Sequence, residues 1–214
     1  MRWSRNILIG FGLGLLTLCF AQPALVRAAD APASPAPRAV MEKVTADALA
    51  VLRDGQLALD AKREKIKQIA YANINFEVMG RLSLGRYWRD LPDDKKAQYS
   101  AEFKEHVTNT YGHTTDDYTN ENVTVDGDRR ETDGDWTVNT RIVGIKDNKP
   151  NQEIAKVEYR FRQQDGQWKI IDFTIDGVSL VANFRSQFQE IMTDGGIDQL
   201  LKLLHDKNVA NDKQ

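Results

Sequence analysis

The spacing of apolar residues along the chain changes in character near residue 118. Before that point, apolar residues recur every three or four positions, which is the period of a helix with one face turned away from water. After it, apolar and polar residues alternate, which is the period of a strand with one buried face. The sequence therefore predicts a helical N-terminal part followed by a sheet.

Four helices are predicted before the change, near residues 40–52, 61–71, 76–88 and 91–111. The second of these helices is rich in basic residues. The fourth begins at a proline followed by two acids, which suits the positive end of a helix dipole. It carries four bulky groups at a spacing of four, so they line one side of the helix: Tyr99, Phe103, Val107 and Tyr111.

Four strands are predicted next, near residues 123–125, 136–142, 157–161 and 168–175. Asp-Gly pairs after the first strand and before the last are typical turn residues. Helical spacing returns near residues 180–191 and 197–204. Helices segregated from a run of strands predict an α+β fold, with an antiparallel meander of about four strands.

The N-terminus has the pattern of a secretory signal peptide. Arg2 and Arg5 precede an apolar run of about 14 residues, shorter than the roughly 20 that span a bilayer. We expect residues 1–28 to be removed, with cleavage after Ala28. An uncleaved membrane anchor is the alternative, and a lipoprotein is disfavoured because the bulky Leu18 precedes Cys19.

The remaining boundaries follow from composition. Residues 29–38 are rich in alanine and proline and are predicted to be a flexible linker. Residues 39–208 form the predicted single domain, and residues 209–214 a polar tail. Export predicts a periplasmic location, and we expect a monomer.

Composition excludes several classes of protein. The chain has 214 residues, 41% of them hydrophobic, with 29 basic against 31 acidic side chains. A disordered chain is excluded, and the charge balance argues against a nucleic-acid binder. The single cysteine, Cys19, lies in the predicted signal peptide, so a disulfide framework and a paired-thiolate zinc site are excluded.

No catalytic or metal motif stands out. His106 and His113 share a predicted helix face, but no third ligand follows at a metal-like spacing, and His205 is distant in sequence. The acidic stretch 126–135 lacks the ligand order of a calcium loop and is predicted to be a hairpin turn. No nucleophile elbow or phosphate-binding glycine loop is present. We therefore expect no catalytic residues, no metal and no cofactor.

Large apolar residues are numerous for a domain of this size, on both the helices and the strands. They either fill an ordinary core or line a cavity for a ligand. Periodicity reports only which face turns away from water, so both interpretations remain open at this point.

Three segments together resemble the MlaC family of periplasmic lipid-binding proteins, also called the toluene-tolerance family. They are Leu84-Gly85-Arg86-Tyr87-Trp88-Arg89, Gly177-Val178-Ser179-Leu180-Val181 with the following Phe184-Arg185-Ser186-Gln187-Phe188, and Gly195-Gly196-Ile197-Asp198-Gln199-Leu200. The likeness runs in order from about residue 40 to 205. A related branch of the family is associated with hopanoid lipids, and the motifs do not separate the two branches.

The resemblance implies a curved NTF2-like sheet wrapped by N-terminal and C-terminal helices, with phospholipid as cargo. It implies a carrier that holds acyl chains in an apolar pocket and maintains outer-membrane lipid asymmetry. The implied partners are an inner-membrane ABC transporter with MCE domains and an outer-membrane lipoprotein complex. The implied lipid-binding residues are Leu84, Tyr87, Trp88, Phe103, Val107, Tyr111, Val138, Ile142, Val157, Tyr159, Phe161, Ile171, Phe173, Ile175, Val178, Leu180, Val181, Phe184 and Phe188.

Two other classes of function remain as alternatives. One is a non-catalytic adaptor of an envelope complex, with a solid core and no cargo. The other is an enzyme that acts on a lipid inside the cavity. A co-purifying lipid distinguishes the carrier from the adaptor, and loss of turnover on changing one acidic or histidine residue would identify the enzyme.

Overall fold

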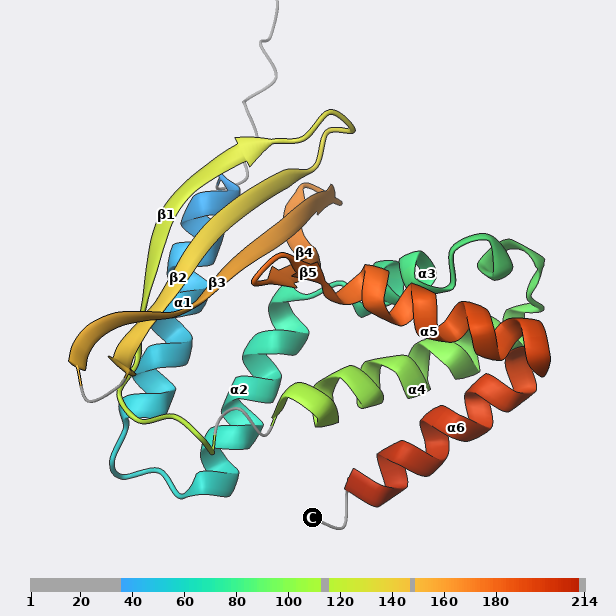
Figure 1. The fold of residues 1–214 in the computed structure, drawn as a ribbon, viewed down its shortest axis with the longest axis horizontal. Helices are drawn as coiled ribbons and strands as arrows, with labels where there is room; N and C mark the ends of the chain where they lie inside the picture. The colour runs from blue at the N-terminus through green and yellow to red at the C-terminus, as the bar shows by residue number, and fades with distance from the viewer. Residues whose placement is uncertain (1–35, 113–115, 147–148, 212–214) are drawn as a thin grey trace, which may run out of the picture. The chain divides into compact units, whose positions relative to one another are not determined.

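The computed structural model describes residues 36–112, 116–146 and 149–211, so the predicted signal peptide and most of the predicted linker lie outside the described residues. Helices and strands follow one another in the order that the spacing predicts, and the α+β class is confirmed. Six α-helices and a five-stranded antiparallel sheet make up the described part of the chain. Figure 1 shows the curved sheet beside α1 and α2, with α3 to α6 gathered next to β4 and β5.

Two helices open the described chain. Helix α1, Pro37–Arg53, starts with a proline, whose missing N–H is not needed in the first turn. It begins two residues inside the predicted linker and buries Met41 and Leu49. Helix α2, Leu59–Asn73, has no buried residue at all. Its apolar face is therefore only partly buried, with Ala70 and Tyr71 packed against buried residues of the helices further along the chain.

The predicted helix at 76–88 changes form at a glycine. Helix α3, Phe76–Leu84, ends at Gly85, whose φ of 55° lies in the left-handed region that favours glycine. A 3-10 helix, η1, continues from Gly85 to Asp90. Helix α4, Asp93–Gly112, then buries Tyr99, Phe103 and Val107 on the predicted face, along with His106.

The sheet is a meander in which each strand pairs with the next. Its strands are β1 (Asn122–Arg130), β2 (Trp136–Lys146), β3 (Lys149–Gln164), β4 (Gln167–Ile175) and the two-residue β5 (Val178–Ser179). The predicted turn after Val125 is wrong, because β1 continues past an irregularity at Val125/Gly127 to Arg130. The pair Asp126-Gly127 lies at this irregularity within β1. The chain turns back from β1 into β2 later, at residues 131–135.

The two faces of the sheet differ in polarity. Val138, Phe161 and Ile170 are buried on the inner face and pack against Met41 of α1. The outer face carries charged side chains, among them Arg160 and Arg162. Both arginines hydrogen-bond to the buried carboxylate of Asp135 at distances of 2.7–2.8 Å. Asp135, at the end of the acidic stretch 126–135, therefore ties the start of β2 to β3 through two arginines.

A second core lies among the helices. Helix α5, Leu180–Asp194, and helix α6, Gly196–Asn211, pack with α3 and α4. Four aromatic rings from α4 and α5 meet in this core with centroid distances of 5.3–6.3 Å: Tyr99, Phe103, Phe184 and Phe188. This helical core is a packed interior, and it holds one end of α4 in place while the other end reaches the sheet.

Candidate functional site

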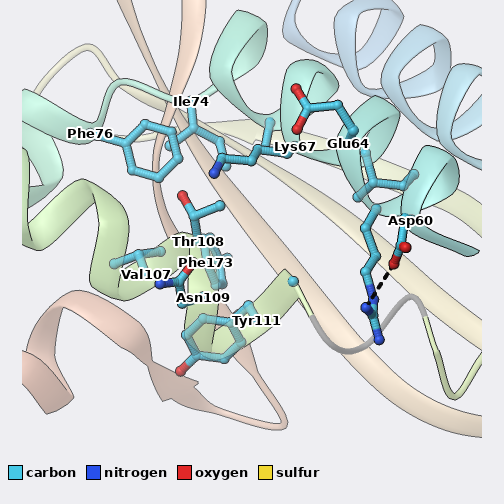
Figure 2. Close-up of a pocket in the computed structure, with 14 residues that line it drawn as sticks. Asp60, Glu64, Lys67, Ile74, Phe76, Val107, Thr108, Asn109, Tyr111 and Phe173 are labelled. Carbon is cyan, nitrogen blue, oxygen red and sulfur yellow. Dashed lines mark hydrogen bonds and ion pairs between the residues drawn. The ribbon is translucent and has the colours of Figure 1, made fainter. Parts of the chain in front are cut away.

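A cavity of about 320 Å³ lies where α2, α4 and β4 meet. That volume is at the lower end of the roughly 300–1,000 Å³ usual for small-molecule sites. Figure 2 shows the side chains around it. The residues that line the cavity are Asp60, Arg63, Glu64, Ile66, Lys67, Ala70, Ile74, Phe76, Val107, Thr108, Asn109, Tyr111, Gly112 and Phe173.

The inner wall of the cavity is apolar and aromatic. Tyr111 of α4 meets Phe173 of β4 edge to face, with ring centroids 5.8 Å apart, and Tyr159 of β3 lies beside Phe173 at 6.4 Å. Burial raises the pKa of Tyr111 and raises that of Tyr159 to about 12. Both phenols therefore stay neutral near pH 7, and the wall presents no charge to a ligand.

One rim of the cavity is charged. Asp60, Arg63, Glu64 and Lys67 all line it from α2, at the spacing i, i+3, i+4 and i+7 that puts residues on one helix face. Arg63 donates to Asp60 at 3.1 Å and to both oxygens of Asp116 at 2.9 and 2.5 Å, and the hydrogen bond to Asp116 raises its pKa. The same cavity therefore has an apolar wall and a charged rim.

The exposure of α2 is explained by this arrangement. Ile66 and Ala70 continue the same helix face toward the apolar wall, and Ile74 follows directly after the helix, yet none of the three is fully buried. An amphipathic helix in a globular protein normally buries such a face in the core. Here the face borders the cavity, so its apolar surface is turned inward while only part of it packs against the core.

A model of the MlaC protein family matches residues 42–206. The chain belongs to the MlaC family. The matched segment contains every helix and strand that contributes a residue to the cavity, so the site lies within the family domain.

Relatives of the chain carry names that concern lipids or solvent tolerance. A toluene tolerance protein of Pseudomonas putida is 25% identical over 86% of this chain and 84% of its own. The intermembrane phospholipid transport system binding protein MlaC of Haemophilus influenzae is 23% identical over 60% of this chain, and the match spans 59% of that protein. A phospholipid-binding protein of Ralstonia solanacearum, solved with a phospholipid, has the same fold, with a TM-score of 0.70, 22% identity, and coverage of 82% of this chain and 98% of that one.

Three of the residues that the MlaC resemblance implies line the cavity: Val107, Tyr111 and Phe173. Others lie in the helical core and contact one another: Leu84, Trp88, Phe103, Leu180, Val181, Phe184 and Phe188. A further set lies on the strands of the sheet: Val138, Ile142, Val157, Tyr159, Phe161 and Ile171. Their contact with lipid stays a prediction.

The three remaining implied residues lie nearer the surface. Ile175 and Val178 are exposed at the β4–β5 end of the sheet. Tyr87 is half-buried, and its hydroxyl lies 3.2 Å from that of Thr193 on α5. None of the three borders the cavity between α2, α4 and β4.

The contribution of α2 was missed in the sequence. Its residues Arg63, Ile66, Lys67 and Ala70 lie at the i, i+3, i+4 and i+7 positions of one face, and Ile74 follows directly after the helix. That spacing is present in the sequence, but the many basic residues of the helix are more typical of a face exposed to solvent than of one that lines a cavity. The mixture of charged and apolar residues on one stripe was the available clue.

The histidines, the remaining candidates for chemistry, do not line the cavity in the part of the chain that the structure describes. His106 is buried beside Phe184, His205 lies 3.0 Å from Glu102, and His113 lies outside the described residues. Residues 36–112, 116–146 and 149–211 contain no group of three or more His, Cys, Asp or Glu side chains placed to hold a metal. Across those same ranges, every helix is too short or too polar to cross a bilayer.

Proposed function

We propose that this protein is a periplasmic phospholipid carrier. The observation that carries the proposal is the only partly buried apolar face of α2, which closes a cavity whose inner wall is apolar and whose rim is charged. Acyl chains match the wall, and a polar headgroup matches the rim. Membership of the MlaC family and the names of the relatives support the same cargo.

The free energy of keeping acyl chains away from water explains why a carrier needs a cavity. Two acyl chains with about 30 methylenes lose roughly 24 kcal/mol of favourable burial when they are exposed to water, at about 0.8 kcal/mol per methylene. A carrier must therefore enclose the chains. A bilayer buries the acyl chains equally well, so the free energy of transfer from membrane to protein is close to zero. The transfer therefore requires no catalytic group.

Loading requires the cavity to widen. Two acyl chains occupy more space than the 320 Å³ between α2, α4 and β4. Helix α4 is anchored by the aromatic helical core, whereas α2 has no buried residue. We therefore expect α2 to be the wall that moves, because its displacement breaks the fewest packed contacts.

The rest of the transport route is part of the same proposal. Cargo passes between an outer-membrane lipoprotein complex and an inner-membrane ABC transporter with MCE domains, and the direction of transfer comes from these partners. The carrier performs no chemistry on the lipid. The predicted export signal supports the periplasmic location, and the names of the relatives support the pathway.

A cavity-filling variant tests the proposal. Ala70→Trp puts an indole into the cavity, and Ala50→Trp puts one on an exposed position of α1 as a matched control. The purified mature proteins are incubated with phospholipid vesicles, separated from them, extracted with organic solvent and analysed by mass spectrometry. We expect wild type and Ala50→Trp to carry phospholipid and folded Ala70→Trp to lose most of it.

Two results would contradict the carrier. One is a wild-type protein that neither co-purifies with lipid nor extracts it from vesicles, which would favour the adaptor. The other is a folded Ala70→Trp that loads as well as wild type, which would place the cargo elsewhere. The mass spectrum also separates phospholipid from hopanoid cargo.

A further inference from the structure

One edge of α2 faces α4 across a seam that is crossed by contacts of positively charged side chains. Arg63, Lys67 and Tyr71 lie four residues apart on α2, so they form a stripe along this edge. At one end of the stripe, Arg63 donates to both carboxylate oxygens of Asp116, in the segment that follows α4, at 2.9 and 2.5 Å.

The other two positions of the stripe contact α4 itself. The ammonium of Lys67 lies 3.8 Å from a carboxylate oxygen of Glu105, and that of Lys104 lies 3.6 Å from the centroid of the Tyr71 ring. The side chains of the two ion pairs are 28–38% exposed. Ion pairs and cation–π contacts at such exposure are weak, and salt screens them. The contacts across the seam therefore exchange readily for water.

The rest of α2 is held by the backbone and by apolar packing. At its C-terminal end, Asn75 donates its backbone N–H to the oxygen of Ile170 on β4 at 2.8 Å, and Ala70 and Tyr71 pack against the helical core. Near its beginning, the ammonium of Lys62 donates to a backbone oxygen of α1 at 2.6 Å. Helix α2 is thus tied to α1 and to β4, while its N-terminal half is joined toward α4 by the two ion pairs.

The seam leads into the cavity. Arg63 and Lys67 line the cavity from α2, and Thr108 and Gly112 line it from α4. Figure 2 shows Lys67 extending from α2 toward Thr108. Separation of the two helices along the stripe would therefore open the apolar wall to the outside.

A second hollow adjoins the cavity at the Tyr71 end of the seam. It has a volume of about 420 Å³ and shares Ile74 and Phe76 with the cavity, and Tyr71 and Lys104 are among its other lining residues. Separation of Tyr71 from Lys104 would widen the connection between the two spaces. Opening the seam therefore supplies room as well as an entrance.

We propose that the seam between α2 and α4 is the opening through which cargo enters and leaves the cavity, and that the stripe is its latch. The latch consists of three charged contacts that cross the seam: Arg63 with Asp116, Lys67 with Glu105, and Lys104 with Tyr71. Charged contacts suit this task because they close the seam in water and yet break at little cost. This inference rests on the proposed carrier function and adds the route of the cargo to it.

Cross-linking the seam tests the route. The mature protein cleaved after Ala28 has no cysteine, so engineered thiols are its only ones. Lys67→Cys with Glu105→Cys is joined by a short bifunctional thiol reagent that dithiothreitol removes. Uptake of a self-quenched fluorescent phospholipid from phosphatidylcholine vesicles is followed by the gain in fluorescence. We expect the cross-link to slow loading by about tenfold or more, and dithiothreitol to restore the rate.

Matched controls isolate the seam. Lys95→Cys with Asp198→Cys joins α4 to α6 across an ion pair of 2.6 Å, away from the seam, and should load as wild type when it is cross-linked. Lys67→Cys alone, capped with the one-ended form of the reagent, controls for reagent bulk and should load far faster than the cross-linked pair. Arg63→Cys with Asp116→Cys closes the seam at a second place, for use if the first pair does not fold.

Single substitutions test the latch. Glu105→Gln removes the partner of Lys67, and Lys104→Gln removes the cation over Tyr71, so each should speed loading about threefold. The vesicles carry no net charge, so these changes leave attraction to the membrane unaltered. Lys202→Gln on α6 is an exposed control and should load as wild type. Added salt should speed wild type and leave the cross-linked protein unchanged.

The possible failures are distinguishable. A wild-type protein that takes up no lipid would overturn the carrier itself. A cross-linked seam that loads as fast as the reduced protein would place the entrance elsewhere and leave the carrier standing. Equal slowing by the Lys95–Asp198 cross-link would mean that loading needs general flexibility, which would overturn the seam as the route. Unchanged or slower loading of Glu105→Gln and Lys104→Gln would overturn the latch.

Discussion

His106 is a titratable side chain inside the helical core. It is 8% exposed, its ring meets that of Phe184 at 5.7 Å, and its Nδ1 atom has no hydrogen-bond partner. Burial lowers the pKa of His106, and the nearby charge of Lys207 lowers it further, while a hydrogen bond with Asn208 opposes both. The folded protein therefore favours the neutral imidazole.

This shift predicts an acid-sensitive fold. The pKa of His106 in the folded state lies below its unfolded value of about 6.5, so its contribution to stability is present above that pH. The contribution is lost as the pH falls below about 6.5, because only the unfolded chain takes up the proton easily. Urea denaturation of wild type and His106→Phe on both sides of pH 6.5 measures the difference, and we expect wild type to lose more stability in acid.

His205 supplies the control for this experiment. It is exposed and lies beside Glu102 on the surface, so His205→Gln measures what the loss of a surface histidine does to the same curves. Identical pH dependence in wild type and His106→Phe would show that the buried imidazole does not contribute.

The contact between α3 and α4 depends on the absence of a side chain at Gly80. A Cβ atom added there would lie 3.1 Å from Cδ1 of Phe103 and 3.2 Å from Cε1 of Tyr99. Both rings belong to the helical core, and the Tyr99 hydroxyl is held 2.6 Å from that of Ser83 on α3. Glycine costs helix propensity, but it lets the two helices approach closely.

Gly80→Leu is therefore expected to lower the free energy of unfolding by about 1–3 kcal/mol, because the added side chain overpacks the helical core. Gly80→Ala should have a smaller effect, since its better helix propensity offsets part of the crowding. Chemical denaturation measures both. Ala46→Leu, at an exposed site of α1, should stay within about 0.5 kcal/mol of wild type. Equal stability of Gly80→Leu and wild type would mean that α3 and α4 separate without cost.

The described chain as a whole contains two cores with different tasks. The helical core is closed by aromatic rings from α4 and α5, and the second core joins α1 to the inner face of the sheet. The cavity lies where α2, α4 and β4 meet, with Phe173 packed against both cores. A ligand in the cavity therefore adds contacts between parts of the fold that are otherwise held by few buried groups.

This arrangement predicts that cargo stabilises the protein. A ligand that binds only the folded state adds about 2.7 kcal/mol when its free concentration is one hundred times Kd. Thermal unfolding of phospholipid-loaded protein should occur at a higher Tm than that of protein stripped of lipid. The cavity-filled Ala70→Trp should show no such difference. A Tm that does not depend on lipid in wild type would argue against a cargo enclosed by the fold.

The order of elements was predictable because each depends on local spacing. The stripe of Tyr99, Phe103, Val107 and Tyr111 forms one face of α4, and the alternating residues of β2 and β3 form the inner face of the sheet. The turn after Val125 was misread because an Asp-Gly pair favours both a reversal and an irregularity within a strand. The difference between them depends on how far the neighbouring strand continues.

The candidate site was less predictable for a related reason. Phe103 and Tyr111 share one helix face and one residue class, yet Phe103 is sealed in the helical core and Tyr111 borders the cavity. What differs is the partner opposite each ring, which comes from distant parts of the chain: α5 for Phe103 and β4 for Tyr111. Lys67 was missed because a charged residue on a basic helix gives no local sign that a cavity lies beside it.

The fold class, the order of helices and strands, the family and the faces that turn away from water could be predicted from the chain alone, because these follow from local periodicity and short motifs. Which apolar faces are packed and which border a cavity depended on contacts between distant parts of the chain. The reason is physical: burial removes a side chain from water in either case, and the sequence pattern records that removal without recording what fills the space. Helix α2 shows the difference most clearly, since its apolar face is turned inward, packs against the core only in part and borders the cavity.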